Sequence, residues 1–118
     1  MLNLKQTSNV YLAIGKTDMR KSIDGLAVIV QMSFKLDPFS NAIFVFCNSK
    51  RDKIKLLFWE NNGFWLAYRR LERGRFKWPE SPNDKVMPIT ERQLHWLLDG
   101  LDIHQNGAHR AVKQRKII

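Results

Sequence analysis

The residues best suited to binding chemistry lie between Tyr68 and Trp78. This stretch reads Tyr-Arg-Arg-Leu-Glu-Arg-Gly-Arg-Phe-Lys-Trp, and residues 69–77 within it carry a formal charge of +4. Aromatic residues are interleaved with the cations, and a nucleic acid offers phosphates to cations and base faces to aromatic rings. We predict a basic surface at the end of a small sheet that binds nucleic acid, with phosphate contacts from Arg69, Arg70, Arg73, Arg75 and Lys77. The alternative is an edge strand whose charges only protect it from aggregation.

Two further basic clusters are candidate phosphate sites. The first lies at an expected helix start, where Arg20 and Lys21 would strengthen an anion site made by unpaired N–H groups. Asp18 in the same turn offers an alternative, since its carboxylate would satisfy the helix dipole and pair with these cations. The second cluster is the loop at residues 50–53 with Lys55 beyond it, which has the alternative of being an ordinary solvated loop.

Residues capable of catalysis are present, but no motif groups them. The histidines have no paired cysteines and are interpreted as surface residues: His95, His104 and His109. No local pattern is typical of a nucleophile with its base, and the glycines form no phosphate loop. The acids are scattered, mostly at expected element ends: Asp18, Asp24, Asp37, Asp52 and Glu60. We predict no enzyme activity, no cofactor and no metal. A phosphoryl-transfer enzyme is the alternative if Asp18, Asp24 or Asp52 meet in a cleft.

Length and composition restrict the class of protein. A chain of 118 residues with 44% apolar residues predicts one domain with a real core. Its net charge of +9 and pI of about 10.1 predict attraction to nucleic acid or an anionic membrane. The single Cys47 lies in an apolar run and is expected to be buried and inert. The chain shows no signal-peptide pattern and no apolar run near the roughly 18 residues of a bilayer span, so we expect a cytoplasmic location.

The first half of the chain predicts a strand, a helix and a second strand. Residues 10–14 are short and partly β-branched, which is typical of a strand. A helix is expected from a cap at Thr17 or Asp18 to about Leu36, because apolar residues recur at helical spacing. Residues 43–47 are apolar on both faces and should form a central strand.

The middle of the chain predicts an antiparallel meander. A strand at residues 54–59 should turn at 60–63, where an Asn-Gly pair tolerates the positive φ of a tight hairpin, and return at 64–69. A turn at Gly74 would lead to a final edge strand at 75–78. The aromatic residues of the hairpin are predicted to be core rather than stacking platforms: Trp59, Phe64 and Trp65.

The last third predicts a loop, a helix and a tail. The loop is marked by Pro79, Pro82 and Pro88. Thr90 and Gln93 form a capping-box pattern before a leucine stripe that ends near Gly100.

The fold class expected from this order is α+β. We predict an antiparallel meander sheet of four to five strands, with two helices packed on one face. Residues 1–103 should form a single domain, and residues 104–118 a basic, flexible tail.

Several ordered blocks of this sequence resemble a known family. They are Thr17-Asp18-Met19-Arg20-Lys21, Asp24-Gly25-Leu26-Ala27, Asp37-Pro38-Phe39-Ser40, Phe44-Val45-Phe46, Ile54-Lys55, Arg70-Leu71-Glu72-Arg73-Gly74-Arg75-Phe76 and Trp78-Pro79. With this spacing the chain is similar, over roughly residues 10–102, to the second-frame accessory protein of the sixty-six family of bacterial insertion sequences. The resemblance implies a mobile-element protein that is encoded beside a separate transposase and is needed for transposition.

The residues and the resemblance together predict a non-catalytic accessory factor for transposition. It would bind nucleic acid, with DNA favoured, through the basic surface of its sheet. The alternative is a protein–protein adaptor that docks onto the transposase without contacting DNA, so that the same arginines face an acidic patch of that partner.

Overall fold

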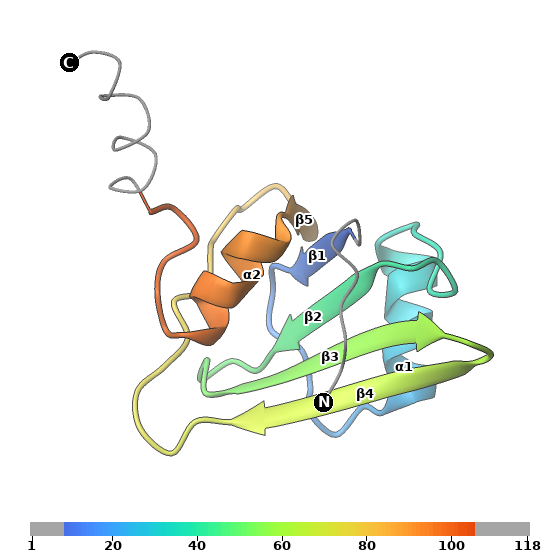
Figure 1. The fold of residues 1–118 in the computed structure, drawn as a ribbon, viewed down its shortest axis with the longest axis horizontal. Coiled ribbons are helices and arrows are strands. Elements are labelled where there is room, and N and C mark those ends of the chain that lie inside the picture. Colours follow the sequence, from blue (N-terminus) through green and yellow to red (C-terminus); the bar gives the residue numbers. More distant parts are fainter. Residues whose placement is uncertain (1–8, 106–118) are drawn as a thin grey trace, which may run out of the picture.

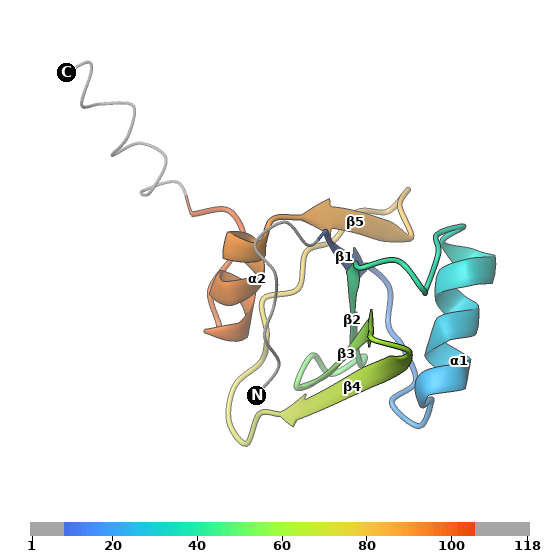
Figure 2. The ribbon, with the colours of Figure 1, turned by 45° about the vertical axis from the view of Figure 1, so that its right-hand side comes forward.

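The fold is a five-stranded mixed sheet with a helix on each face (Figures 1 and 2). It comes from a computed structural model, which describes residues 9–105. The predicted tail therefore lies outside the described residues from residue 106 onward. The elements are β1 (Val10–Ala13), α1 (Ile23–Val28) with a π-helical continuation η1 (Ile29–Ser33), β2 (Ile43–Cys47), β3 (Lys53–Glu60), β4 (Gly63–Arg70), β5 (Val86–Ile89) and α2 (Glu91–Leu98).

The strands lie in the order β4-β3-β2-β1-β5. β1 and β2 are parallel, with Val10 beside Ile43 and Leu12 beside Val45, and the other neighbours are antiparallel. A parallel pair needs a crossover, and α1 is that crossover. The α+β class is confirmed. The prediction of a purely antiparallel sheet was wrong, because β1 and β2 are parallel and only β2, β3 and β4 form a meander.

The placement of both helices on one face was also wrong. All five residues of β2 are buried, so each face of the sheet needs an apolar cover. On one face, Phe44 and Phe46 of β2 pack with Leu26 and Val30 from α1 and η1. On the other face, the core includes α2 and two aromatic residues of the 76–78 segment. Figure 2 shows the sheet between the two helices.

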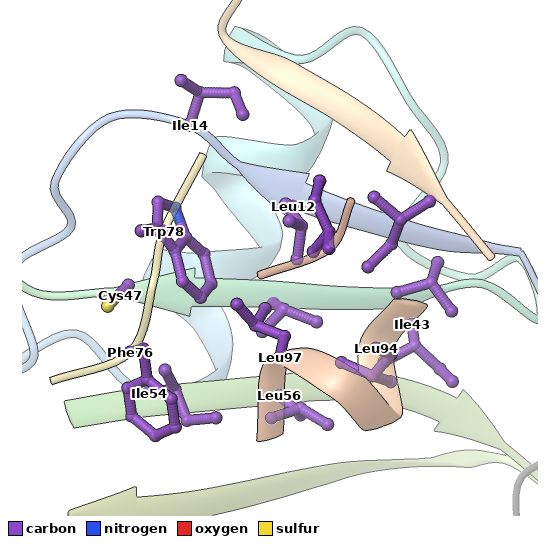
Figure 3. Packing of buried hydrophobic residues seen from close by; sticks show 14 of the residues in the cluster. Leu12, Ile14, Ile43, Cys47, Ile54, Leu56, Phe76, Trp78, Leu94 and Leu97 are labelled. Carbon is purple, nitrogen blue, oxygen red and sulfur yellow. The ribbon is translucent and has the colours of Figure 1, made fainter. Parts of the chain in front are cut away.

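The segment expected to be an edge strand at 75–78 is an irregular chain that lies over the α2 face. Phe76 and Trp78 are 2% and 8% exposed, and Figure 3 shows them in the core that also receives Leu94 and Leu97. The indole N–H of Trp78 donates to the carbonyl of Ala13 at 2.9 Å. Phe76 and Trp78 point into the core while Arg75 and Lys77 are exposed, so the rings are not the stacking platforms for bases that the sequence suggested. Residues 75–78 form no strand. The packing of the two rings in the core fixes this segment, rather than a ladder of backbone hydrogen bonds to a neighbouring strand.

The fifth strand is β5, in a region predicted to be loop because of Pro88. It pairs with β1, with Pro88 opposite Tyr11. β5 is the outer strand at its side of the sheet, and an edge strand tolerates a residue that lacks an N–H.

The first helix begins later than predicted. Its N-cap is Ser22, which makes no side-chain cap bond. Asp18 instead accepts a bond from the backbone N–H of Arg20 at 2.9 Å and so forms a turn before the helix. The helical region ends at Ser33, and Lys35 follows with a φ of 59°.

Two local predictions are confirmed in the later elements. Thr90 Oγ1 accepts from Gln93 N at 3.0 Å, and Gln93 Oε1 accepts from Thr90 N at 2.9 Å, so the capping box is formed. β3 and β4 form the expected hairpin, but its positive φ angles belong to Asn61 and Asn62 rather than to Gly63.

We predict that Trp78→Ala lowers the free energy of unfolding by about 3–5 kcal/mol, because it empties a buried aromatic site and removes the bond to Ala13. Lys77→Ala, one residue away but exposed, should change it by less than about 0.5 kcal/mol. Urea denaturation followed by circular dichroism measures both. Equal effects would show that this segment is not anchored by its aromatic residues.

Candidate nucleic-acid interface

Three segments leave the same end of the sheet, which we call the basic end (residues 15–22, 48–53 and 70–77). β1 and β2 both finish there because they are parallel. β3 begins there, since Ile54 pairs with Cys47, and β4 finishes there, since Arg70 pairs with Lys53. Six of the eight predicted contact residues lie in these segments: Arg20, Lys21, Arg70, Arg73, Arg75 and Lys77.

The loop at residues 48–53 is ordered by its own side chains. The amide oxygen of Asn48 accepts from the backbone N–H groups of Asp52 at 3.1 Å and Lys53 at 3.0 Å. Asn48 Nδ2 donates to Asp52 Oδ1 at 2.7 Å, and this bond is the main reason why the pKa of Asp52 is lowered. Arg51 has a φ of 60° and donates to the carbonyl of Ile14 at 3.2 Å, so its side chain is used within the fold.

The third segment packs directly on this loop. The N–H of Leu71 donates to the carbonyl of Asp52 at 2.8 Å, and the N–H of Phe76 donates to that of Arg51 at 2.7 Å. Between these two anchors, Gly74 takes a φ of 77° and turns the chain. The backbone that carries the arginines is therefore fixed at both sides of the turn.

Of the six predicted contact residues at the basic end, four form no ion pair within residues 9–105. They are exposed and lie in the first and third segments of the basic end: Lys21, Arg73, Arg75 and Lys77. The last three lie on the anchored turn after β4, so their ammonium and guanidinium groups point to solvent from a defined backbone.

Two predicted contact residues pair with carboxylates. Arg20 lies 2.7 Å from Asp18, as the alternative for this cluster expected, and this guanidinium holds the pKa of Asp18 well below its usual range. Arg70 lies 2.8 Å from Glu72, whose hydrogen bond raises the pKa of Arg70. Both arginines remain exposed, and exposed pairs of this kind are weak.

Lys55 and Arg69 donate to backbone carbonyls. Lys55 Nζ lies 2.7 Å from the carbonyl oxygen of Met19 and 2.8 Å from that of Lys21, so it ties the first segment to β3. Arg69 Nη1 lies 2.8 Å from the carbonyl oxygen of Leu98, the last residue of α2. Adjacent residues of a strand face opposite sides, so Arg69 and Arg70 lie on different faces of the sheet.

Three further lysines lie at the basic end: Lys16, and Lys50 and Lys53 of the predicted loop cluster. Lys16 and Lys53 line a hollow of about 470 Å³ together with Thr17, Asn48 and Ser49. The bond from Thr17 N to the carbonyl of Cys47, at 2.8 Å, brings the first two segments together here. Lys53 belongs to the loop at residues 50–53 that the sequence offered as a candidate phosphate site, and the hairpin register pairs it with Arg70.

The structure also bears on metal binding, membrane spanning and the state of Cys47. Among residues 9–105, no three His, Cys, Asp or Glu side chains are grouped so as to hold a metal ion, and His109 lies outside that range. No helix in the same range is long and apolar enough to cross a bilayer. Cys47 is buried as predicted, and its burial raises the pKa of the thiol.

The prediction that Trp65 is a core residue was wrong. Its side chain is 55% exposed on the α2 face of β4, and its indole N–H donates to Glu60 at 3.1 Å. Trp59 and Phe64 are half-buried instead, with ring centroids 4.9 Å apart. The hairpin extends past the core, so its alternation of aromatic residues does not imply two covered faces.

Comparison with known proteins defines the class to which this fold and basic surface belong. A family model described as IS66 Orf2 like protein matches residues 8–108. The uncharacterized protein y4hO of Sinorhizobium fredii is 37% identical over 102 residues, which are 86% of this chain and 88% of that protein. The uncharacterized protein y4jC of the same organism is 26% identical over 102 residues, covering 86% of each chain. No solved structure matches the chain.

These matches place the chain among accessory proteins of insertion-sequence transposition, which are not a known class of catalytic enzymes. The chain belongs to the family of IS66 Orf2-like proteins. The resemblance found in the sequence is thereby confirmed, and membership supports an accessory role in transposition.

We predict that Lys55→Met lowers the free energy of unfolding by about 1.5–3 kcal/mol, because methionine keeps the apolar stem but removes a charged donor from two carbonyls. Lys50→Met removes the same charge from an exposed side chain in the neighbouring loop and should cost less than about 0.5 kcal/mol. Urea denaturation measures both. Similar values for the two variants would contradict a structural tie at Lys55.

The lowered pKa of Asp52 predicts a pH dependence of stability. The ordinary pKa of an aspartate carboxyl is 3.8, and the folded pKa of Asp52 is lower. Its stabilising contribution is therefore fully present above pH 3.8 and is lost as the pH falls through the folded pKa. Asp52→Asn should therefore be less stable than the unmodified chain at pH 7, and this difference should shrink as the pH falls below 3.8.

Denaturation curves from pH 7 downward test this expectation. Glu80→Gln, at an exposed carboxylate without a hydrogen-bond partner in residues 9–105, is the matched control and should show no such convergence. A gap between Asp52→Asn and the unmodified chain that stays constant at all pH values would refute the role of the Asn48–Asp52 bond.

Proposed function

We propose that this protein is a non-catalytic accessory factor for transposition that binds DNA at the basic end of its sheet. The observation that carries the proposal is the anchored turn after β4. Arg73, Arg75 and Lys77 are exposed there without carboxylate partners in residues 9–105, while Phe76 and Trp78 hold the same segment in the core. A rigid, cationic loop of this kind suits a row of phosphates.

The charge balance of the folded part supports the same proposal. Residues 9–105 contain 15 lysines and arginines against 11 aspartates and glutamates, yet ion pairs join only Arg20 to Asp18 and Arg70 to Glu72. Repulsion among the other cations at the basic end disfavours the free protein, and a polyanion would relieve it.

The burial of Phe76 and Trp78 favours duplex DNA over a single strand at the turn after β4. Proteins that hold single strands stack bases on exposed aromatic rings. Phe76 and Trp78, which the sequence placed among the arginines as candidate stacking residues, face the core instead. The charged groups exposed after Gly74 and at Arg73 are cations, which contact phosphates without reading sequence. We therefore propose a contact with the duplex backbone, made by Lys21, Arg73, Arg75 and Lys77, with Arg20 and Arg70 at its margins.

We predict that affinity for duplex DNA falls steeply with salt. If about five phosphates are neutralised, the logarithm of the association constant should fall against the logarithm of salt concentration with a slope of about −4.5. The Arg73→Glu/Arg75→Glu double variant should weaken binding to all sequences alike and reduce the slope by about 2. Fluorescence anisotropy with two unrelated labelled duplexes measures both quantities.

The control carries the same change of charge at the other end of the sheet. Lys35 precedes the start of β2, and Arg92 follows the end of β5, which is antiparallel to β1. The Lys35→Glu/Arg92→Glu variant should therefore keep most of the slope. Loss of the slope in both double variants would indicate attraction by net charge alone. Salt-independent affinity, or none, would contradict the proposal and favour the adaptor that docks onto a transposase.

A further inference from the structure

The outer edge of β4 is long and is left unprotected along most of its length by residues 9–105. β4 pairs with β3 without a bulge over all eight residues from Gly63 to Arg70. Its other side has no strand partner in residues 9–105, and Figure 1 shows it as the lower border of the sheet. Trp65 and Tyr68 are 55% and 53% exposed along it.

The opposite edge of the same sheet is built differently. β5 has only four residues, and Pro88 among them lacks an N–H donor. Short edge strands and prolines are the usual means of preventing contact between edges. β4 has neither, and its charges are confined to its last two residues, Arg69 and Arg70. A long strand left open at one edge only is a candidate for pairing with another chain.

The hydrogen-bond ladder shows which residues of β4 have free backbone groups. The bond from Leu71 N to the carbonyl of Asp52 continues the β3–β4 ladder beyond Arg70. In an antiparallel pair, bonded and non-bonded residues alternate, so odd-numbered residues of β4 bond to β3. The N–H and carbonyl groups that face outward therefore belong to Phe64, Leu66, Tyr68 and Arg70.

Two aromatic side chains, Phe64 and Trp65, lie near the start of β4, and its two cations, Arg69 and Arg70, lie at its end, next to Tyr68. A second copy running antiparallel would bring the cations of each chain to the aromatic rings of the other, a favourable arrangement. A parallel copy would place arginines beside arginines. We propose that the free edge of β4 pairs antiparallel with β4 of a second copy, which forms a dimer with a continuous ten-stranded sheet.

One register satisfies both the backbone and the side chains. Residues whose backbone N–H and carbonyl groups face outward must lie opposite one another in the two copies. Because these are alternate residues of the strand, only every second register is possible. With Ala67 opposite its own copy on the two-fold axis, Arg69 faces Trp65 and Arg70 faces Phe64 across the interface. The two nearest allowed registers place these arginines opposite Gly63 and Asn62, or opposite Ala67 and Leu66, where no ring is available.

Charge variants at Ala67 test the dimer and its register together. Sedimentation equilibrium of the full chain should give twice the chain mass of 13.9 kDa. Ala67→Lys and Ala67→Glu, each alone, should give the monomer mass, because like charges meet across the axis. An equal mixture of the two should recover the dimer mass. Circular dichroism checks that each variant remains folded.

The control is Val28→Lys, which replaces another exposed apolar residue, on α1, and should leave the dimer mass unchanged. A monomeric unmodified chain would overturn the proposal and leave the edge to a strand of another protein. Two dimeric Ala67 variants, or a monomeric Val28→Lys, would place any dimer interface elsewhere. Failure of the mixture to pair would rule out this register.

A disulfide provides a second measurement that does not depend on charge. A non-hydrogen-bonded antiparallel pair brings two Cα atoms to about 4.5 Å, within the range that a disulfide spans. Ala67→Cys should form a covalent dimer under mild oxidation, seen on a non-reducing gel. Asn61→Cys, exposed in the hairpin turn away from the axis, should not, and the unmodified chain controls for the buried Cys47. Equal cross-linking at both positions, or none at Ala67→Cys, would contradict the proposal.

Discussion

The burial of β2 on both faces is the constraint on which the rest of the fold depends. Phe44 and Phe46 face one side, and Ile43 and Val45 face the other, so the chain must supply two separate covers. The first cover is α1, and its position between β1 and β2 makes those strands parallel. The second cover is α2, which has only eight residues. The area that α2 leaves open is filled by Phe76 and Trp78.

This second cover links the core to the basic surface. Phe76 and Trp78 alternate with Arg75 and Lys77, so burying the rings forces the cations outward. Bonds to the carbonyls of Asp52 and Arg51 fix the same segment on the neighbouring loop. The surface charge is thus held in place by apolar packing and backbone bonds, which do not depend on salt. Mutual repulsion among the cations can persist without loosening the turn that carries them.

Features set by adjacent residues could be predicted from the sequence, and those set by distant contacts could not. The capping box at Thr90 and the hairpin between β3 and β4 depend on a few neighbouring residues. The 75–78 segment alternates as a strand does, but nothing in its own residues shows that the core, rather than a neighbouring strand, holds it. We predicted Lys55 and Arg69 as phosphate contacts because their side chains are positively charged. In the structure they donate instead to backbone carbonyls 29 to 36 residues away.

β4 connects the basic end with the proposed dimer edge, and this connection determines what a dimer could bind. The two-fold axis at Ala67 would run perpendicular to the sheet, because antiparallel pairing keeps each α1 on the same face. The two basic ends would then point in opposite directions along the joined strands. One short duplex could reach only one of them, so dimerisation would add a second binding site without tightening the first. Affinity for a short duplex and self-association are therefore separable properties, even though Arg70 lies at the border of both surfaces.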